Sequence, residues 1–226
     1  MEVDVIFLSY TKDLYYYGLT QRAISSLLKK NSDCSFNIIL IETNKNLEEE
    51  YFFYNDCRVI IPPEEFNYNK FLNIGLQYCR NQYVIMCNND IIFGDSSVRN
   101  LINTMNENDM HSACPLEPNW HKRKLSEEEY NSQFIEGYEV EKHIVGWCIC
   151  SDRKMLIENR ILDEKFAFWY QDNDYARSLQ SLGIKHYLVN SSHVYHEFSA
   201  SHGLLGDRSD NLTHGMRTVY EKKWCS

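Results

Sequence analysis

The 226-residue chain carries a formal charge of −9 at neutral pH, which argues against an extended phosphate-binding surface and leaves room only for a local basic groove toward nucleic acid. Its 43% of apolar residues excludes an intrinsically disordered protein and suffices for one core, so we expect a single domain over residues 1–226. No apolar run approaches the roughly 20 residues of a membrane-spanning helix, no signal-like segment opens the chain, and the scattered cysteines suit reduced thiols, which together predict a cytoplasmic protein.

Apolar runs in the first half predict strands at 3–10, 36–42, 57–62 and 83–87. Between them, apolar side chains recur at helical spacing around 19–28 and again at 69–80. Strands that are apolar throughout and alternate with helices indicate an α/β fold with a mostly parallel, Rossmann-like central sheet flanked by helices. Ligands of such sheets bind beyond the carboxyl ends of the strands.

The second half is less regular. Residues 116–143 have a dense mix of charges and few aliphatic side chains, which indicates a long excursion from the core. A strand is expected at 143–151 and a helix at 173–182, which Gly183 ends. Residues 187–197 are expected to be extended, and an amphipathic helix closes the chain.

Three polar residues, Asn88-Asn89-Asp90, interrupt two apolar runs. Burying an unpaired carboxylate is costly, so Asp90 is expected at a strand end, facing a cation or strong donors. A tight turn is the alternative, because Asn and Asp favour turns. The position of Asp90 beyond the carboxyl end of the fourth predicted strand favours a binding site.

A second polar cluster, Gln171-Asp172-Asn173-Asp174, follows three aromatic residues and opens a predicted helix. Asp and Asn are favoured at helix N-termini, so capping is one interpretation. The other is that a carboxylate beside an aromatic wall acts as a general base. In the extended segment, His193 and His196 should point to opposite faces and so cannot easily share one metal ion.

Several motifs in order along the chain resemble glycosyltransferase family 2, whose members have the GT-A fold. The opening "VDVIFLSYTKD" resembles the first strand and nucleotide-contacting turn of that family, and Ile41-Glu42-Thr43-Asn44 its acidic second-strand position. "FLNIGLQYCRNQYVIMCNNDIIF" resembles the Asn-x-Gly helix followed by the Asp-x-Asp metal motif. "FWYQDNDYARSLQSLG", "VYHEFSAS" and the terminal "YEKKW" resemble later family segments.

The resemblance implies a metal-dependent, inverting glycosyltransferase that uses a nucleotide-diphosphate sugar, with a UDP-sugar as the expected donor. It implies a nucleotide-binding half at about 1–95 and an acceptor half at about 96–226. Asp172 matches the catalytic base, and Asp90 with His196 would hold Mn²⁺ or Mg²⁺. The residues expected to bind the donor are Ser9, Tyr10, Glu42, Lys70, Asn73, Asn88 and Asn89. Lys70 is equally consistent with a solvated helix residue.

Two departures from the family pattern stand out. Asn88 replaces the first Asp of the metal motif, which weakens the expected metal affinity, and Gln171 replaces the usual Glu before Asp172. A noncatalytic nucleotide-sugar or glycan-binding module is therefore one alternative. A sugar nucleotidyltransferase is another, although "LSYTKDLYYYGLT" lacks the glycine-rich phosphate loop that such enzymes usually carry.

The acceptor is expected to be a glycan or another hydroxyl-bearing molecule, with a modified nucleobase as an alternative. Trp147, Trp169 and Asp174 are the candidate acceptor contacts, although a tryptophan more often packs in a core. The basic and aromatic residues at 120–124 suggest a lid over bound donor, with a solvated loop as the alternative.

Overall fold

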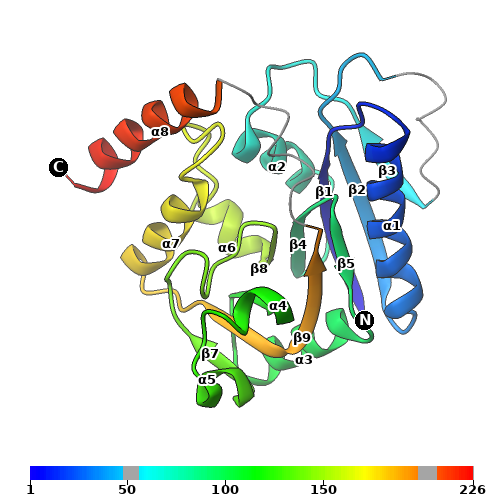
Figure 1. The fold of residues 1–226 in the computed structure, drawn as a ribbon, viewed down its shortest axis with the longest axis vertical. Helices are drawn as coiled ribbons and strands as arrows, with labels where there is room; N and C mark the ends of the chain where they lie inside the picture. The colour runs from blue at the N-terminus through cyan, green and yellow to red at the C-terminus, as the bar shows by residue number, and fades with distance from the viewer. Residues whose placement is uncertain (48–55, 198–207, 226) are drawn as a thin grey trace.

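The structure is a computed structural model that describes the backbone of residues 1–47, 56–197 and 208–225 (Figure 1). Within these residues, one sheet has the strand order β3-β2-β1-β4-β8-β6-β9-β5, with β7 paired to β9. The strands are β1 (Glu2–Ser9), β2 (Ser35–Glu42), β3 (Cys57–Ile60), β4 (Tyr83–Asn88), β5 (Ile91–Phe93), β6 (Ser112–Leu116), β7 (Phe134–Glu136), β8 (Cys148–Asp152) and β9 (Tyr187–His196). The helices are α1 (Leu14–Lys30), α2 (Tyr68–Leu76), α3 (Ser97–Glu107), α4 (Pro118–His121), α5 (Glu127–Asn131), α6 (Arg153–Glu158), α7 (Gln171–Ser181) and α8 (Arg208–Trp224).

Most of the described strands run in one direction. β3, β2, β1 and β4 are parallel neighbours, β8 is antiparallel to both β4 and β6, and β9 is parallel to β6. β5 and β7 pair antiparallel with β9. Of the described strands, only β5, β7 and β8 therefore oppose the common direction, which confirms the predicted α/β fold with a mostly parallel sheet.

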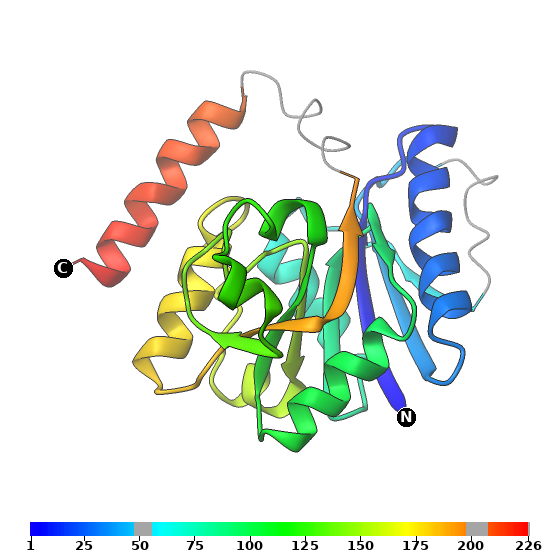
Figure 2. The same ribbon diagram turned by 60° about the horizontal axis from the view of Figure 1, so that its bottom comes forward.

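Helices cover both faces of the sheet, as Figures 1 and 2 show. Val3, Val5 and Phe7 of β1 pack with α1 and α3 on one face, whereas Ile6 and Leu8 pack with α2, α6 and α7 on the other. Alternating side chains of one strand thus enter two separate cores. This explains why the sequence is apolar throughout β1, without the alternation that a half-exposed strand would show.

The second half differs in detail from the expected elements. The strand expected at 143–151 begins only at Cys148, because residues 141–143 form a turn in which Glu141 N–H donates to Ile144 O. The 116–143 excursion is ordered and contains α4, α5 and β7. The predicted helix stop is confirmed, since Gly183 has a φ of +67° just beyond α7.

α8 lies apart from the sheet, and Figure 2 shows its C-terminal end near α7. The segment 198–207, which connects it to β9, lies outside the described residues, as do the side chains of 208–214. Among the described helices, none is both long enough and apolar enough to span a bilayer.

Candidate active site

The carboxyl ends of four strands bring together most of the predicted site residues. Ser9 ends β1, Glu42 ends β2, Asn88 ends β4 and His196 ends β9. Because these four strands run in the same direction, their last residues lie along one edge of the sheet. This is the edge where ligands of parallel sheets bind.

Asp90 and His196 meet at this edge. Asn89 and Asp90 form the turn between β4 and β5, so the Asn-Asn-Asp segment is both a turn and part of the site. The Asp90 side chain is only 3% exposed, and its Oδ1 lies 3.1 Å from His196 Nε2. The pairing of Ile91 with His196 and the bond from Glu197 N–H to Asp90 O fix this approach. As expected from the alternation of side chains along β9, His193 lies on the face opposite to His196 and is exposed.

These two side chains fit a divalent cation. Asp90 Oδ1 is buried and accepts no hydrogen bond from the described residues, so its 3.1 Å approach to His196 is not a well-directed hydrogen bond. Neighbouring ligands of an octahedral ion with bonds of about 2.1 Å stand about 3 Å apart, which matches this separation. Within the described residues, no group of three His, Cys, Asp or Glu side chains converges. A cation here would depend on a ligand for its remaining coordination.

The predicted donor-binding residues Ser9 and Asn89 belong to a network of hydroxyl and amide groups. Ser9 Oγ lies 3.0 Å from Thr20 Oγ1 and 3.4 Å from Thr11 Oγ1, and Asn89 Nδ2 donates to Thr20 Oγ1 over 2.9 Å. Ser9 is buried, whereas Tyr10 beside it is 41% exposed. Sequence reasoning singled out neither Thr11, which lies within the "VDVIFLSYTKD" segment, nor Thr20, which stands in no recognisable motif.

Glu42 supports this network from behind. It is fully buried and accepts hydrogen bonds from Thr11 N–H, Thr11 Oγ1 and Asn44 N–H, at 2.7–3.2 Å. Burial raises the pKa of Glu42, and the N–H groups of Asn44 and Thr11 oppose that shift. The Glu42 carboxylate thus holds the turn after β1, and its direct contact with the nucleoside stays a prediction.

Asp172 lies in the first turn of α7 against a glycine. A side chain at Gly146 would collide with the Asp172 carboxylate, so the two segments approach as closely as they do only because residue 146 lacks one. Burial raises the pKa of Asp172 from 3.8 to about 6; the Gly146 N–H opposes the shift, and the Glu141 carboxylate adds to it. Tyr68, at the start of α2, donates its hydroxyl hydrogen to Gly146 O over 3.0 Å. Sequence reasoning missed Tyr68, whose only signal is its place just after the N-cap Asn67.

Trp147 connects Asp172 to the Asp90–His196 pair. Its indole ring stacks on the His196 ring, with centroids 4.8 Å apart and planes 23° apart. Its backbone oxygen accepts a hydrogen bond from Asn88 N–H over 3.0 Å. The preceding Gly146 contacts Asp172. Trp120, from the ordered excursion, packs edge-on against Trp147 at 5.6 Å and so adjoins the same site.

Trp169 and Asp174, the other two predicted acceptor residues, lie in different surroundings. Trp169 and Tyr170 both have left-handed backbones, with φ of +59° and +61°, in the turn that leads into α7. Such strain in bulky residues is characteristic of functional segments. Asp174 is 0% exposed, and its carboxylate is occupied by Lys223 and Trp224 of α8 at 2.7–3.1 Å. Asp174 thus holds α8 against α7, and its acceptor contact stays a prediction.

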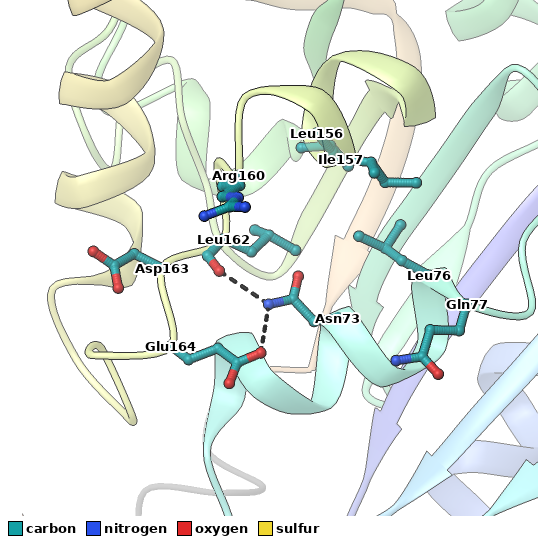
Figure 3. A pocket seen from close by; sticks show the side chains of 9 residues that line it. All are labelled: Asn73, Leu76, Gln77, Leu156, Ile157, Arg160, Leu162, Asp163 and Glu164. Atoms are coloured by element: carbon teal, nitrogen blue, oxygen red, sulfur yellow. Dashed lines mark hydrogen bonds between the residues drawn. The ribbon is translucent and has the colours of Figure 1, made fainter.

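Asn73 and Lys70 do not join the site. Figure 3 shows the Asn73 amide bound to Leu162 O and Glu164 Oε1, at 3.0 and 2.9 Å, beside an open cavity of about 590 Å³ between α2 and α6. Asn73 thus ties α2 to the segment before α7, and its donor contact stays a prediction. Lys70 Nζ lies 3.4 Å from Glu64, which supports the solvated alternative.

Comparison with known proteins agrees with the arrangement of strands and site. The family model described as glycosyl transferase family 2 matches residues 5–148. Among curated proteins, no sequence matches significantly. Crystal structures of S. aureus TarS resemble the fold at low identity. TarS 1–349 has a TM-score of 0.64 and 13% identity over 87% of this chain and 60% of that one. TarS 1–349 in complex with UDP-GlcNAc gives 0.61 and 11%, over 86% and 58%.

The chain thus spans about 60% of the length of the TarS 1–349 structure. At this identity the likeness to TarS supports the fold alone. The family match is broader evidence, because it covers well over half of the chain and includes the ends of β1, β2 and β4, Asp90 and the Gly146-Trp147 segment. The chain belongs to glycosyl transferase family 2.

Proposed function

We propose that this chain transfers a sugar from a nucleotide-diphosphate sugar to an acceptor hydroxyl, with inversion at the anomeric carbon. The observation that carries the proposal is the continuous contact from Asp172 through Gly146-Trp147 to His196 and Asp90. A half-buried carboxylate and a cation-binding pair thus flank one short segment. These are the two groups that direct displacement of a diphosphate by a hydroxyl requires.

Asp172 is the proposed catalytic base. It must be ionised to accept the acceptor proton, and a pKa of about 6 leaves it mostly ionised at neutral pH yet more basic than an exposed aspartate. Attack by the activated hydroxyl opposite the departing diphosphate predicts inversion. The left-handed backbone of Trp169 and Tyr170 sets the start of α7, and with it the place of this carboxylate.

Asp90 and His196 are the proposed ligands of Mn²⁺ or Mg²⁺. When bound there together with the diphosphate, such an ion neutralises the charge that develops on the leaving group. Trp147 stacks on the His196 ring in a nearly parallel arrangement, so the imidazole needs little ordering before it binds. Replacement of the usual Asp by Asn88 leaves one carboxylate in this motif, which predicts weak metal affinity without donor.

The donor is proposed to lie over the ends of β1 and β4. Asn88 is half-buried, and its side chain makes no hydrogen bond to the described residues, so its amide is free to bind the nucleoside or ribose. Ser9, Asn89 and the exposed Tyr10 ring adjoin the same turn. The UDP-GlcNAc complex of TarS supports a UDP-sugar as donor. Trp147 and Trp169 remain the proposed acceptor-side aromatics.

The Asp172→Asn variant tests the proposal. Transfer should fall by about 10²–10⁴-fold while donor affinity stays within a few-fold, because a base acts in the transition state and not in donor binding. Unchanged turnover in the folded variant would remove Asp172 as the base. Donor binding with no turnover in the wild-type chain, across a broad acceptor panel, would favour the binding-module alternative.

A further inference from the structure

A small cavity lies directly behind Asp172, enclosed by α2, β4, β8 and α7. Its volume is about 20 Å³. The lining includes Tyr68, Gly146, Gln171 and Asp172 together with apolar side chains such as Met86. A cavity needs roughly 10–15 Å³ to hold one water molecule. The space therefore suits one water and nothing larger.

The polar groups around the cavity are mostly satisfied by other partners. Tyr68 donates to Gly146 O, and the Tyr175 hydroxyl lies 2.7 Å from Ser112 Oγ and 2.6 Å from Ser151 Oγ. Gln171 is the exception. Its Oε1 is buried and accepts no hydrogen bond from the described residues, and a buried carbonyl oxygen without a donor is unfavourable.

Two acceptors at the cavity have unused capacity: Gln171 Oε1, which has no partner among the described residues, and the Asp172 carboxylate, which accepts from the Gly146 N–H and has further lone pairs. Neither can donate a hydrogen to the other. A molecule with two donors is needed to satisfy both, and water has two.

We propose that one buried water bridges Gln171 Oε1 and the Asp172 carboxylate, which makes Gln171 a positioning residue for the base. The base role of Asp172 belongs to the function proposed above. The water donates one hydrogen to each oxygen, so it fixes the carboxylate from behind while the opposite side faces the acceptor. Hydrogen bonds to a carboxylate favour its ionised form and therefore oppose the effect of burial.

The other titratable groups that face Asp172 do not supply this stabilisation. Tyr68 of α2 and Cys114 of β6 are buried weak acids whose pKa values are raised, and Glu141 lies in the turn before Gly146 with its own negative charge. None of the three is a cation. The Gly146 N–H and the proposed water are thus the two donors that keep Asp172 ionised.

Titration of the Asp172 carboxyl carbon by ¹³C NMR tests the proposal, with Asp172→Asn to assign the resonance. The wild-type pKa should lie near 6. Gln171→Leu, which keeps the volume but removes the acceptor that anchors the water, should raise the pKa by about 0.5–1 unit. Gln171→Glu, which places a like charge at the same cavity, should raise it by at least about 1 unit. Gln180→Glu makes the same charge change on the exposed face of α7 and should leave it within about 0.2 unit.

A pKa that is unchanged in folded Gln171→Leu would overturn the proposal, as would a crystal structure with an ordered Gln171 and either no density or a metal ion in the cavity. The titration needs no activity, so the two proposals fail separately. A shifted pKa in a chain that transfers no sugar would keep the water bridge and reject the function. An active chain in which the pKa of Asp172 is the same in wild type and in both Gln171 variants would keep the proposed function and reject the water bridge.

Discussion

Replacing Gly146 by alanine displaces the proposed base, Asp172, without changing residue 172 itself. An alanine Cβ at this position would lie 2.5 Å from Asp172 Oδ2 and 2.7 Å from its Cγ. Ordinary contacts between such atoms are about 3.5–4.0 Å, so the carboxylate has to move by about 1 Å. It is the end of a side chain, and it can rotate away more readily than the backbone of the turn before β8 can shift.

The expected loss is therefore catalytic more than structural. A misplacement of about 1 Å costs on the order of 10²-fold in rate, equivalent to about 2.7 kcal/mol of activation free energy. Donor affinity should stay within a few-fold, because Gly146 contacts neither Asp90 nor the ends of β1 and β2. The free energy of unfolding should fall by about 1–2 kcal/mol, as for other overpacked sites.

The assay is the release of nucleoside diphosphate from the donor, followed with saturating donor and cation, together with donor affinity by calorimetry. Gly18→Ala in α1 is the matched control, since a Cβ there would only reach Arg22 at an ordinary 3.5 Å. A Gly146→Ala variant with wild-type turnover would show that the close approach to Asp172 is not needed for catalysis.

Three further changes have distinct expected outcomes. Asp90→Asn should weaken donor binding far more in Mn²⁺ than in EDTA, by calorimetry, and equal weakening in both would exclude the metal role. Burial raises the pKa of Asp172 from 3.8 to about 6. Between pH 3.8 and about 6, the Asp172 carboxyl is therefore protonated in the folded state and ionised in the unfolded chain. That contribution to stability is lost as pH rises, so Asp172→Asn should raise the melting temperature at pH 7 more than at pH 4; an equal change at both would contradict this. Lys223→Met, which leaves the buried Asp174 without its ammonium partner, should lower the free energy of unfolding by roughly 2 kcal/mol in denaturant titrations. The exposed pair of Lys154 provides the control, whose loss should cost less than about 0.5 kcal/mol.

The fold was predictable from local patterns because its central strands are short, apolar on both faces and separated by helices with clear periodicity. The boundary at 143–151 was not, because Ile144 and Val145 are buried in an irregular segment between two turns and look like strand residues in the sequence. Burial alone does not distinguish an irregular segment from a strand when both are apolar.

The placement of site residues was predictable where they lie at or just beyond the end of a strand, as His196 and Asp90 do. It was not predictable where a motif residue turns away from the edge. Asn73 lies one helical turn into α2, and its amide faces Leu162 and Glu164, which are about 90 residues away in the sequence. Asp174 is bound by a helix about 50 residues later. Such long-range partners leave no local signal, and the same is true of the contact between Gly146 and Asp172.

The central claim is that the edge formed by Asp90, His196 and Asp172 uses a nucleotide-diphosphate sugar. The most direct measurement is a calorimetric screen of nucleotide sugars against the chain, with Mn²⁺ and with EDTA. The account predicts that at least one nucleotide-diphosphate sugar binds, that Mn²⁺ tightens it, and that Asp172→Asn retains this binding. If no nucleotide sugar binds in either condition, or if only nucleoside triphosphates bind and are consumed with release of pyrophosphate, the assignment of this edge as a sugar-transfer site is contradicted.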